Sequence, residues 1–550
     1  MLSGSSLALL FWWHSLTPTL IPRSWEMQVA IGTTCLIIGY AIGSLAGSWG
    51  HRLLKRWAPS YDNVVRRRTR IIVRAAWLFG ILFGATLWMR LQNEQRDLMG
   101  MASISWLDAV LMGALSPLAG LLLIVVGQVI AKRFVAIRRF VRSRVPSVVL
   151  ATVLLVALLG IALSHGVALR ALTVLANSIY APANEETTEG IVAPDSASVS
   201  GSSASLVAWD TLGRMGRDFV ATATSAEQLS MFHGVDAKLV DPVRVYVGVH
   251  SADSIAERVN LAVRELERAD GFDRKVLVVW VPTGTGWMVP KAAAALELLH
   301  RGDTAIVAIQ YSFLPSLVAV FVHAERANEA GIALFNAVHA RWSELPPGRR
   351  PELLVFGKSL GATGAEAPFV GANAASSVAN IVARTDGALI AGAARSNVIH
   401  AQLTRERDFG SPIRWPVFDK GRSVRFMSRD LDQSTLHTEW SAPRVIYLQH
   451  GSDPVAFWSF EALWRAPEWM AQTRAFDVPD TLRWFPIVTS VQSVGDFLDQ
   501  LGPPPGFGHD YSSSYAKGWA SIAPPEGWTR ADTERLERFV DKLAGDDLEP

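Results

Sequence analysis

The feature that most constrains this chain is an uncharged, mostly apolar run of more than twenty residues between Met27 and Trp49. A helix of that length reaches ~30 Å, which is enough to cross the hydrocarbon core of a bilayer. Further apolar runs occupy residues 71–90, 107–130 and 146–164. The sequence therefore predicts four membrane-spanning helices, and the positive mean hydropathy of +0.22 agrees with this prediction.

A fifth span is an alternative that the sequence leaves open at residues 6–22. This segment is only marginally long enough to cross, and it contains two prolines and His14, so it also fits a re-entrant segment. It lacks the basic start and small-residue cleavage site of a removable signal peptide. In the first clear span, Gly39, Gly43 and Gly47 form a smooth stripe that favours packing inside the bundle, with dimerisation as the alternative. The oligomeric state stays open.

Loop charges predict the orientation of the spans. The loop at 51–70 carries seven Lys or Arg and one Asp, and the loop at 131–144 carries six basic residues, whereas the loop at 91–106 carries two acidic residues and one basic residue. The positive-inside rule places both basic loops in the cytoplasm. We therefore expect a multi-pass protein of the cell membrane in which everything after Ser164, including a large polar domain, is extracytoplasmic.

Composition predicts the domain limits and excludes some classes of site. Residues 181–207 are rich in Ser, Ala, Pro and Gly without an apolar period, which predicts a flexible linker between a transmembrane domain (1–180) and a catalytic domain (208–550). The single cysteine, Cys35, allows no intramolecular disulfide and no cysteine-based metal site. Nothing in the sequence requires a cofactor. A net charge of +2, from 52 basic and 50 acidic residues, gives no reason to expect nucleic acid as a partner.

Strand-like and helical runs alternate after residue 208. The strand-like runs are 243–250, 275–282, 304–312, 352–356, 387–393 and 444–450. This alternation predicts a doubly wound, mostly parallel sheet flanked by helices. Binding and catalytic residues of such sheets lie at the carboxyl ends of the strands.

A serine between two glycines follows one of these strands. The strand at 352–356 leads into Gly357, Lys358, Ser359 and then Gly361. A sharp strand-to-helix turn would lift the serine oxygen out of the sheet, and glycines on either side relieve the crowding that such a turn creates. The same letters also fit an ordinary loop, and the charge of Lys358 leaves the chemistry undecided. Whether Ser359 is a nucleophile therefore depends on whether the chain supplies an acid and a base as its partners.

An acid and a base are available in the order serine, acid, histidine. Asp453 follows the strand that ends at His450, and His509, in a Pro- and Gly-rich loop, is the single histidine after Asp453. Taken separately, Asp453 fits a turn residue and His509 a solvated loop histidine. Together with Ser359 they predict a catalytic triad. Asp386 is a weaker candidate for the acid because it precedes a strand, and His450 is a weaker base because it precedes the acid.

A triad also needs backbone amides that stabilise an oxyanion. The amide that follows the nucleophile belongs to Leu360, and a second donor is expected in the loop "PTGTGWM" at Thr285 and Gly286. The same loop fits a nucleotide-binding GxGxxG motif poorly, because Val289 stands where the third glycine is needed.

The motifs "SLTPTLIPRSW", "VPTGTGW", "GKSLGATGAE", "QHGSDPV" and "GFGHDY" together resemble the membrane-anchored bacterial α/β-hydrolase family, known mainly from actinobacteria, in which a multi-span N-terminal region precedes a hydrolase domain. The resemblance covers nearly the whole chain. It implies the fold and the catalytic class, and its last three motifs include Ser359, Asp453 and His509. It does not imply a substrate.

The expected function is that of a membrane-anchored serine hydrolase of the esterase or lipase type, which cleaves carboxylic esters of lipids or cell-envelope molecules through an acyl-enzyme. Aromatic residues crowd between the acid and the histidine, where they fit either core packing or an apolar rim for an acyl chain. These residues are Phe457, Trp458, Phe460, Trp464, Trp469, Trp484 and Phe485. A cell-envelope acyltransferase that uses the same acyl-enzyme and a non-catalytic membrane receptor on a hydrolase scaffold are the alternatives.

Overall fold

The computed structural model describes residues 2–54, 63–142, 178–315, 319, 324–429, 436–472, 474–500 and 502–543. The chain divides into two compact units. The helical unit contains Met1–Val167, Gly451–Pro454 and Trp458–Gly508, and the sheet unit contains Ala168–His450, Val455–Phe457 and His509–Pro550. The segment Trp458–Gly508 therefore belongs to the helical unit, although it lies far along the chain from the apolar helices.

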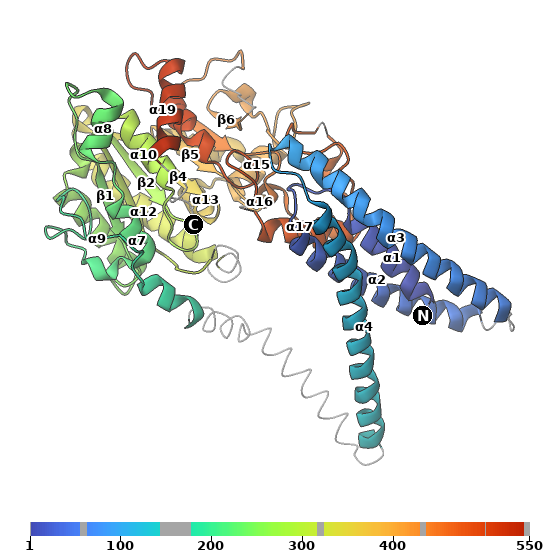
Figure 1. Ribbon diagram of the computed structural model, residues 1–550. Coiled ribbons are helices and arrows are strands. Elements are labelled where there is room, and N and C mark those ends of the chain that lie inside the picture. Colours follow the sequence, from blue (N-terminus) through green and yellow to red (C-terminus); the bar gives the residue numbers. More distant parts are fainter. Residues whose placement is uncertain are drawn as a thin grey trace. The chain divides into compact units, whose positions relative to one another are not determined.

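The helical unit is built on four N-terminal helices and one helix from the later segment (Figure 1). They are α1 (Leu2–Ser15), α2 (Trp25–Leu54), α3 (Asn63–Leu98), α4 (Trp106–Arg142) and α17 (Val488–Leu498), with short 3₁₀ turns η7 (Phe460–Leu463) and η8 (Glu468–Met470). Helix α1 packs along α2, helices α2 and α3 both pack against α4, and α17 contacts α1 and α2.

Three helices in the described part of the chain are long and apolar enough to cross a membrane, and they are Trp25–Gly50, Ile71–Leu98 and Trp106–Arg133. They correspond to the first three predicted spans. The fourth predicted span, 146–164, lies outside the described residues. Helix α1 has 14 residues, so its length of ~21 Å is shorter than the ~30 Å thickness of a bilayer's hydrocarbon core. Residues 6–22 thus do not form one continuous helix, because α1 ends at Ser15.

The glycine stripe on α2 faces α1. A Cβ atom on Gly39 would lie 2.7 Å from the carbonyl oxygen of Leu7, and one on Gly43 would lie 2.5 Å from the carbonyl oxygen of Ser3. Side chains at these positions would push the two helices apart. This confirms the prediction that the stripe packs within the bundle.

A buried polar cluster joins α17 to the loop between α1 and α2. The guanidinium of Arg23 is completely buried and donates to the Gln28 side chain (2.6 Å) and to the carbonyl oxygen of Thr17 (2.7 Å). Asp496 of α17 accepts from the Thr19 hydroxyl at 2.7 Å and lies 3.8 Å from Arg23 Nε. The motif "SLTPTLIPRSW" therefore supplies the surface on which α17 docks.

The sheet unit contains a seven-stranded sheet in the order β1-β3-β2-β4-β5-β7-β6, and all neighbouring strands are parallel. The strands are β1 (Val243–Val247), β2 (Val276–Val281), β3 (Thr304–Ile309), β4 (Glu352–Lys358), β5 (Gly387–Ala391), β6 (Val424–Met427) and β7 (Arg444–Leu448). The six predicted strands are all present, which confirms the parallel sheet. Strand β6, at one edge, was not predicted.

Helices cover both faces of this sheet. On one face the ring of Phe356 packs at a tilt against Trp280 of β2 and against Trp519 of α18, with centroid distances of 4.0 and 5.6 Å. Val281 points to the opposite face because side chains alternate along a strand, and there it meets Gly364 of α13. The helices of the sheet unit are α7 (Gly213–Ala221), α8 (Ala226–His233), α9 (Ile255–Arg268), α10 (Pro290–Leu299), α12 (Ala324–Glu344), α13 (Leu360–Glu366), α14 (Ala374–Arg384), α15 (Val398–Arg405), α18 (Tyr515–Ile522) and α19 (Arg530–Leu543).

Residues 181–207, whose composition predicts a flexible linker, make fixed contacts with the sheet unit. The Ser200 amide donates to the carbonyl oxygen of Arg244 in β1 at 2.9 Å. Farther along, the Ser205 hydroxyl and the Leu206 amide donate to the buried carboxylate of Glu265, at 2.6 and 2.9 Å. Small polar residues here supply hydrogen-bond donors that a buried carboxylate needs.

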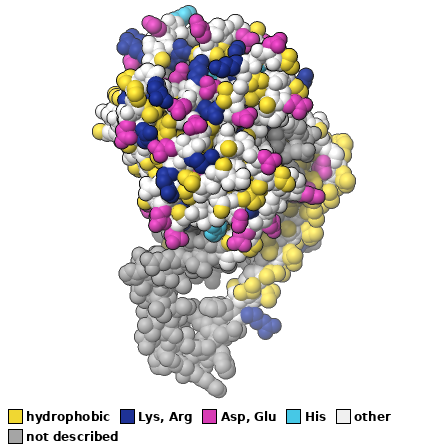
Figure 2. Space-filling view, turned by 90° about the vertical axis from the view of Figure 1, so that its left-hand side faces the viewer, with side chains coloured by type: hydrophobic (Ala, Val, Ile, Leu, Met, Phe, Trp, Pro, Cys, Tyr) yellow, Lys and Arg dark blue, Asp and Glu magenta, His cyan; other side chains and the backbone are white. Residues whose placement is uncertain are grey.

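Acidic and basic side chains are interspersed over the face of the sheet unit that Figure 2 shows, and no patch of a single charge sign stands out there.

Candidate active site

The predicted nucleophile lies at the junction between β4 and α13. Ser359 has a φ of 57° and a ψ of −124°, a combination that glycine normally occupies and that costs a residue with a side chain roughly 1–3 kcal/mol. Its amide donates to the carbonyl oxygen of Ala391 at the end of β5 (2.9 Å). A side chain on Gly357 would clash with the Gly361 carbonyl, and one on Gly361 would clash with the Val281 carbonyl. This is the geometry that a nucleophile elbow requires.

His509 lies at the carboxyl end of the neighbouring strand β5. Its side chain is buried, with 3% of its surface exposed, and its ring packs against Gly392, where a Cβ atom would lie 2.5 Å from Cε1. The ring of Tyr511 meets it edge-on at 5.9 Å. Because Ser359 bonds to Ala391 and His509 packs on the next residue, the structure brings these two predicted residues to the same strand end.

Asp453 comes five residues after the end of β7, which pairs with β5. Its side chain is completely buried. The residue before it, Ser452, accepts a hydrogen bond at 2.9 Å from the amide of Gly508, which is the residue before His509. This hydrogen bond lies within the helical unit, which contains Ser452, Asp453 and Gly508, whereas Ser359 and His509 belong to the sheet unit.

The two weaker candidates occupy other positions. The carboxylate of Asp386 accepts from the Leu353 amide at 2.8 Å, at the amino ends of β4 and β5 and thus at the edge opposite Ser359. His450 stacks on Tyr511 with ring centroids 4.2 Å apart, and its amide donates to the Tyr511 hydroxyl.

The loop after β2 carries the second group of predicted oxyanion donors. The Gly286 amide already donates to the carbonyl oxygen of Thr283 at 2.9 Å. The Gly286 carbonyl accepts from the Tyr246 hydroxyl (2.8 Å), and the Thr285 carbonyl accepts from Gln310 (3.1 Å). Because the Gly286 amide is occupied inside its own turn, the amides of Thr285 and of Leu360, the first residue of α13, are the better candidates.

Comparison with known proteins gives a family match over both regions of the chain. Residues 243–536 match the alpha/beta-hydrolase family, and residues 16–223 match the N-terminal region of the alpha/beta-hydrolase family. The chain belongs to the alpha/beta-hydrolase family. No curated protein and no solved structure matches it.

In this alpha/beta-hydrolase, Lys358 is buried although it lies directly before the serine. Its ammonium group lies 4.9 Å from the ring centroid of Trp287, in the loop after β2. A cation over an aromatic face is attracted by the ring quadrupole. The contact joins β4 to the loop of the predicted oxyanion donors. It could not be predicted from the sequence because the two residues are far apart in the chain.

A buried carboxyl group on α13 was missed by the sequence analysis. Glu366 accepts from the Tyr447 hydroxyl at 2.9 Å and from the Ile399 amide at 3.0 Å. Burial raises the pKa of Glu366 to about 7, and these hydrogen bonds offset part of the effect. Its spacing could have indicated that Glu366 lies on the same helix face as Ser359. Glu366 follows Ser359 by seven residues, which is two helical turns, in a segment of otherwise small and apolar residues.

No group of three or more His, Cys, Asp or Glu side chains is placed to hold a metal ion in the part of the chain that the structure describes.

Proposed function

We propose that this alpha/beta-hydrolase is a membrane-anchored serine hydrolase that cleaves carboxylic esters of lipids or lipid-like molecules of the cell envelope. Ser359 attacks the ester carbonyl, and His509 takes its proton and passes it to the leaving alcohol. Asp453 holds the imidazole in the required tautomer, and the amides of Leu360 and Thr285 stabilise the oxyanion. Water then releases the acyl group from the serine.

The backbone of Ser359 is the observation that carries this proposal. A serine with a φ of 57° is strained, and strain of this size persists where the surrounding structure enforces it. Here two glycines that cannot bear side chains enforce it, at the carboxyl end of a central parallel strand. An ordinary loop would have no need of this strain, because it could place glycine at the serine position.

The position of the histidine supports the same chemistry. His509 packs on Gly392, directly beside the carbonyl group that binds the Ser359 amide. The role of Asp453 rests on its chain order, its complete burial and the hydrogen bond between Ser452 and Gly508. A buried carboxylate needs hydrogen-bonding partners, and an imidazole N–H is one that a triad supplies.

The lipid-like substrate is supported by exposed aromatic residues near the predicted acid in the chain. The aromatic cluster divides in the structure, because Phe457 and Trp469 are buried, whereas Phe460 and Trp464 are 67% and 66% exposed. Both exposed side chains belong to the unit that carries the apolar helices. Exposed aromatic side chains in this segment fit contact with a membrane or with an apolar ligand. The loop charges support an extracytoplasmic position of the sheet unit.

A fluorophosphonate probe tests the proposed nucleophile. The full-length protein in detergent should be labelled, Ser359→Ala should not be labelled, and Ser343→Ala, which changes an exposed serine of α12, should be labelled like the wild type. Labelling that persists in Ser359→Ala, or the absence of labelling in folded wild-type protein, would contradict the proposal that Ser359 is the nucleophile of a serine hydrolase.

Ester turnover tests whether the three residues act as one unit. Single replacements Ser359→Ala, His509→Ala and Asp453→Asn should each lower kcat for a short-chain ester by several powers of ten, and double replacements should cost little more. Asp386→Asn is the matched control for the acid. Collapse of activity in Asp386→Asn, with near-normal activity in Asp453→Asn, would transfer the role to Asp386.

A further inference from the structure

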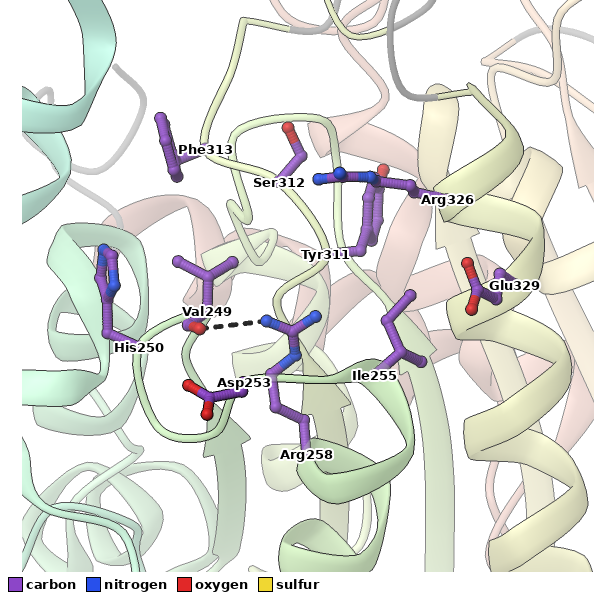
Figure 3. A pocket seen from close by; sticks show the side chains of 10 residues that line it. All are labelled: Val249, His250, Asp253, Ile255, Arg258, Tyr311, Ser312, Phe313, Arg326 and Glu329. Atoms are coloured by element: carbon purple, nitrogen blue, oxygen red, sulfur yellow. Dashed lines mark hydrogen bonds between the residues drawn. The ribbon is translucent and has the colours of Figure 1, made fainter. Parts of the chain in front are cut away.

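Two features of the molecule have no part in the mechanism proposed above. One is a cavity of about 340 Å³ at the carboxyl ends of β1 and β3 (Figure 3). Two arginines and two carboxylates line it, so its lining does not favour a ligand of either charge. These residues are Arg258, Arg326, Asp253 and Glu329. The other feature is helix α17, whose polar and apolar faces are reversed relative to those of a helix in water.

The inward face of α17 is polar and its outward face is apolar. Gln492 and Asp496 are completely buried and hydrogen-bond to residues between α1 and α2. Asp496 is also the only charged residue of this helix. On the opposite face, Val494 and Leu498 are 47% and 56% exposed. A helix of a water-soluble domain buries its apolar face, whereas a helix in a bilayer turns its polar side chains toward the protein and its apolar side chains toward lipid.

The contacts of α17 with α2 lie at the depth of a membrane span. The span of α2 starts at Trp25, and tryptophan is typical of the membrane–water interface. A Cβ atom on Gly495 would lie 2.4 Å from Cδ1 of Ile31, and Val488 packs with Ile31 and Cys35. Ile31 and Cys35 lie ~9 and ~15 Å along the helix from Trp25, at ~1.5 Å per residue. Helix α17 therefore runs beside α2 within the thickness of one leaflet.

The length of α17 agrees with this depth. Its 11 residues extend for ~16 Å, which is about half of the ~30 Å hydrocarbon core of a bilayer. The helix is too short to cross a membrane, but it is long enough to enter one leaflet.

The turn before α17 satisfies its own backbone groups, which a turn in lipid must do because no water is available there. The Phe485 amide donates to the Thr489 hydroxyl at 2.8 Å. The Ile487 amide donates to the carbonyl oxygen of Leu463 in η7 at 3.0 Å. Pro486, between them, has no N–H group. Each amide of this turn is therefore paired.

Residues 460–465, which the Ile487 amide holds beside α17, place aromatic side chains next to charged ones. Phe460 and Trp464 are exposed. Glu461 and Arg465 form an ion pair at 3.4 Å. Aromatic rings beside charged groups are typical of the headgroup level of a membrane, from which charged side chains reach water. This segment thus fits the membrane surface, and α17 fits the acyl chains beneath it.

We propose that α17 and the turn before it are embedded in the outer leaflet of the membrane, where the outward face of α17 contacts the acyl chains of lipids and residues 460–465 lie at the headgroup level. That face consists of Val491, Val494, Phe497 and Leu498. Lipid contact of α17 goes beyond the proposed ester hydrolysis and does not rest on it, because it can be measured without turnover.

Quenching of bimane fluorescence tests the contact with lipid. Full-length protein that carries Cys35→Ala, which removes the single native cysteine, and either Val494→Cys or Leu498→Cys is labelled with bimane. The labelled protein is reconstituted into nanodiscs of phosphatidylcholine with dibrominated acyl chains. Bromine on the acyl chains quenches bimane that contacts lipid, whereas iodide ions quench bimane in water.

Two exposed valines serve as controls. Val110 lies one helical turn into the span that starts at Trp106, and Val235 lies in the loop before β1, at the edge of the sheet opposite Ser359. Brominated lipid should cause the same fractional loss of fluorescence at positions 494 and 498 as at position 110. Iodide should quench the label at position 235 and leave the other three unchanged.

Two results would overturn the inference. Quenching by iodide at positions 494 and 498, without an effect of brominated lipid, would place α17 in water. Labels at 494 and 498 that neither quencher reaches would mean that protein, rather than lipid, covers this face. Circular dichroism checks that each variant is folded. If Cys35→Ala unfolds, the same labels can be attached with Cys35 present, because its side chain is completely buried.

Fluorophosphonate labelling of the same samples separates this inference from the proposed function. A labelled Ser359 together with iodide quenching at positions 494 and 498 would contradict lipid contact and leave the serine hydrolase standing. Lipid quenching at both positions without fluorophosphonate labelling would support the embedded helix and contradict the hydrolase.

Discussion

Replacing the predicted nucleophile by glycine should make the protein more stable while abolishing its activity. Ser359 holds a φ of 57° and a ψ of −124°, which any residue with a Cβ atom adopts at a cost of roughly 1–3 kcal/mol. Ser359→Gly removes that cost. Glycine loses about 1 kcal/mol more conformational entropy on folding than alanine does, which offsets part of the gain. The matched control is Ser359→Ala, which also lacks the nucleophile but keeps the Cβ atom and therefore the strain.

The expected difference between the two variants is ~0–2 kcal/mol in favour of Ser359→Gly, which is the strain released less the entropy lost. For the sheet unit of about 330 residues, this corresponds to a rise of up to roughly 4 °C in the unfolding midpoint. Thermal unfolding of both variants in the same detergent, followed by tryptophan fluorescence and far-UV circular dichroism, measures it. A midpoint for Ser359→Gly below that of Ser359→Ala would refute the argument that the serine backbone is strained.

Three further predictions concern other parts of the molecule. Because burial raises the pKa of Glu366 from 4.5 to about 7, the folded protein keeps a proton that the unfolded chain has released, so the free energy of unfolding should fall as pH rises across this interval. In Glu366→Gln, the denaturation midpoint should no longer fall with pH across this interval. If it falls as in the wild type, another group causes the pH dependence. Asp496→Ala should destabilise the helical unit by about 3–5 kcal/mol, because it leaves Arg23 buried without its carboxylate. The double variant Arg23→Met/Asp496→Leu should recover most of this loss in detergent melts, and recovery of none would mean that the pair is not coupled. A cysteine at the exposed Ser203 should react with an impermeant maleimide in intact cells, and protection there with labelling after permeabilisation would reverse the predicted orientation.

The parts of the fold that follow from local patterns could be predicted from the sequence. The strand that ends in Lys358 is an apolar run directly before glycine, and a buried parallel strand has this pattern. Strand β6 was missed because it has four residues, Val424–Met427, and includes a buried arginine, Arg425, whose charge breaks the apolar pattern. An edge strand this short gains its stability from pairing with β7, which is a tertiary contact.

Other features could not be predicted because they depend on residues far apart in the chain. Gln492 and Asp496 lie one helical turn apart on α17, and in isolation they are typical of a solvated helix face. In the structure, the Gln492 side chain donates to the carbonyl oxygens of Ser15 and Thr17, at 3.1 and 3.0 Å. No periodicity in residues 458–508 indicates that their partners lie near the N-terminus.

The position of residues 458–508 in the helical unit has a consequence for the order of synthesis. Helices α1 and α2 leave the ribosome first, and Arg23 between them must wait for a carboxylate that is translated after all seven strands of the sheet. A chain that stops before residue 458 can insert its apolar helices but leaves the docking surface of α17 uncovered. A truncated chain and the full-length protein therefore differ at this docking surface, which is formed by the first residues to be synthesised. A membrane protease could distinguish the two proteins there.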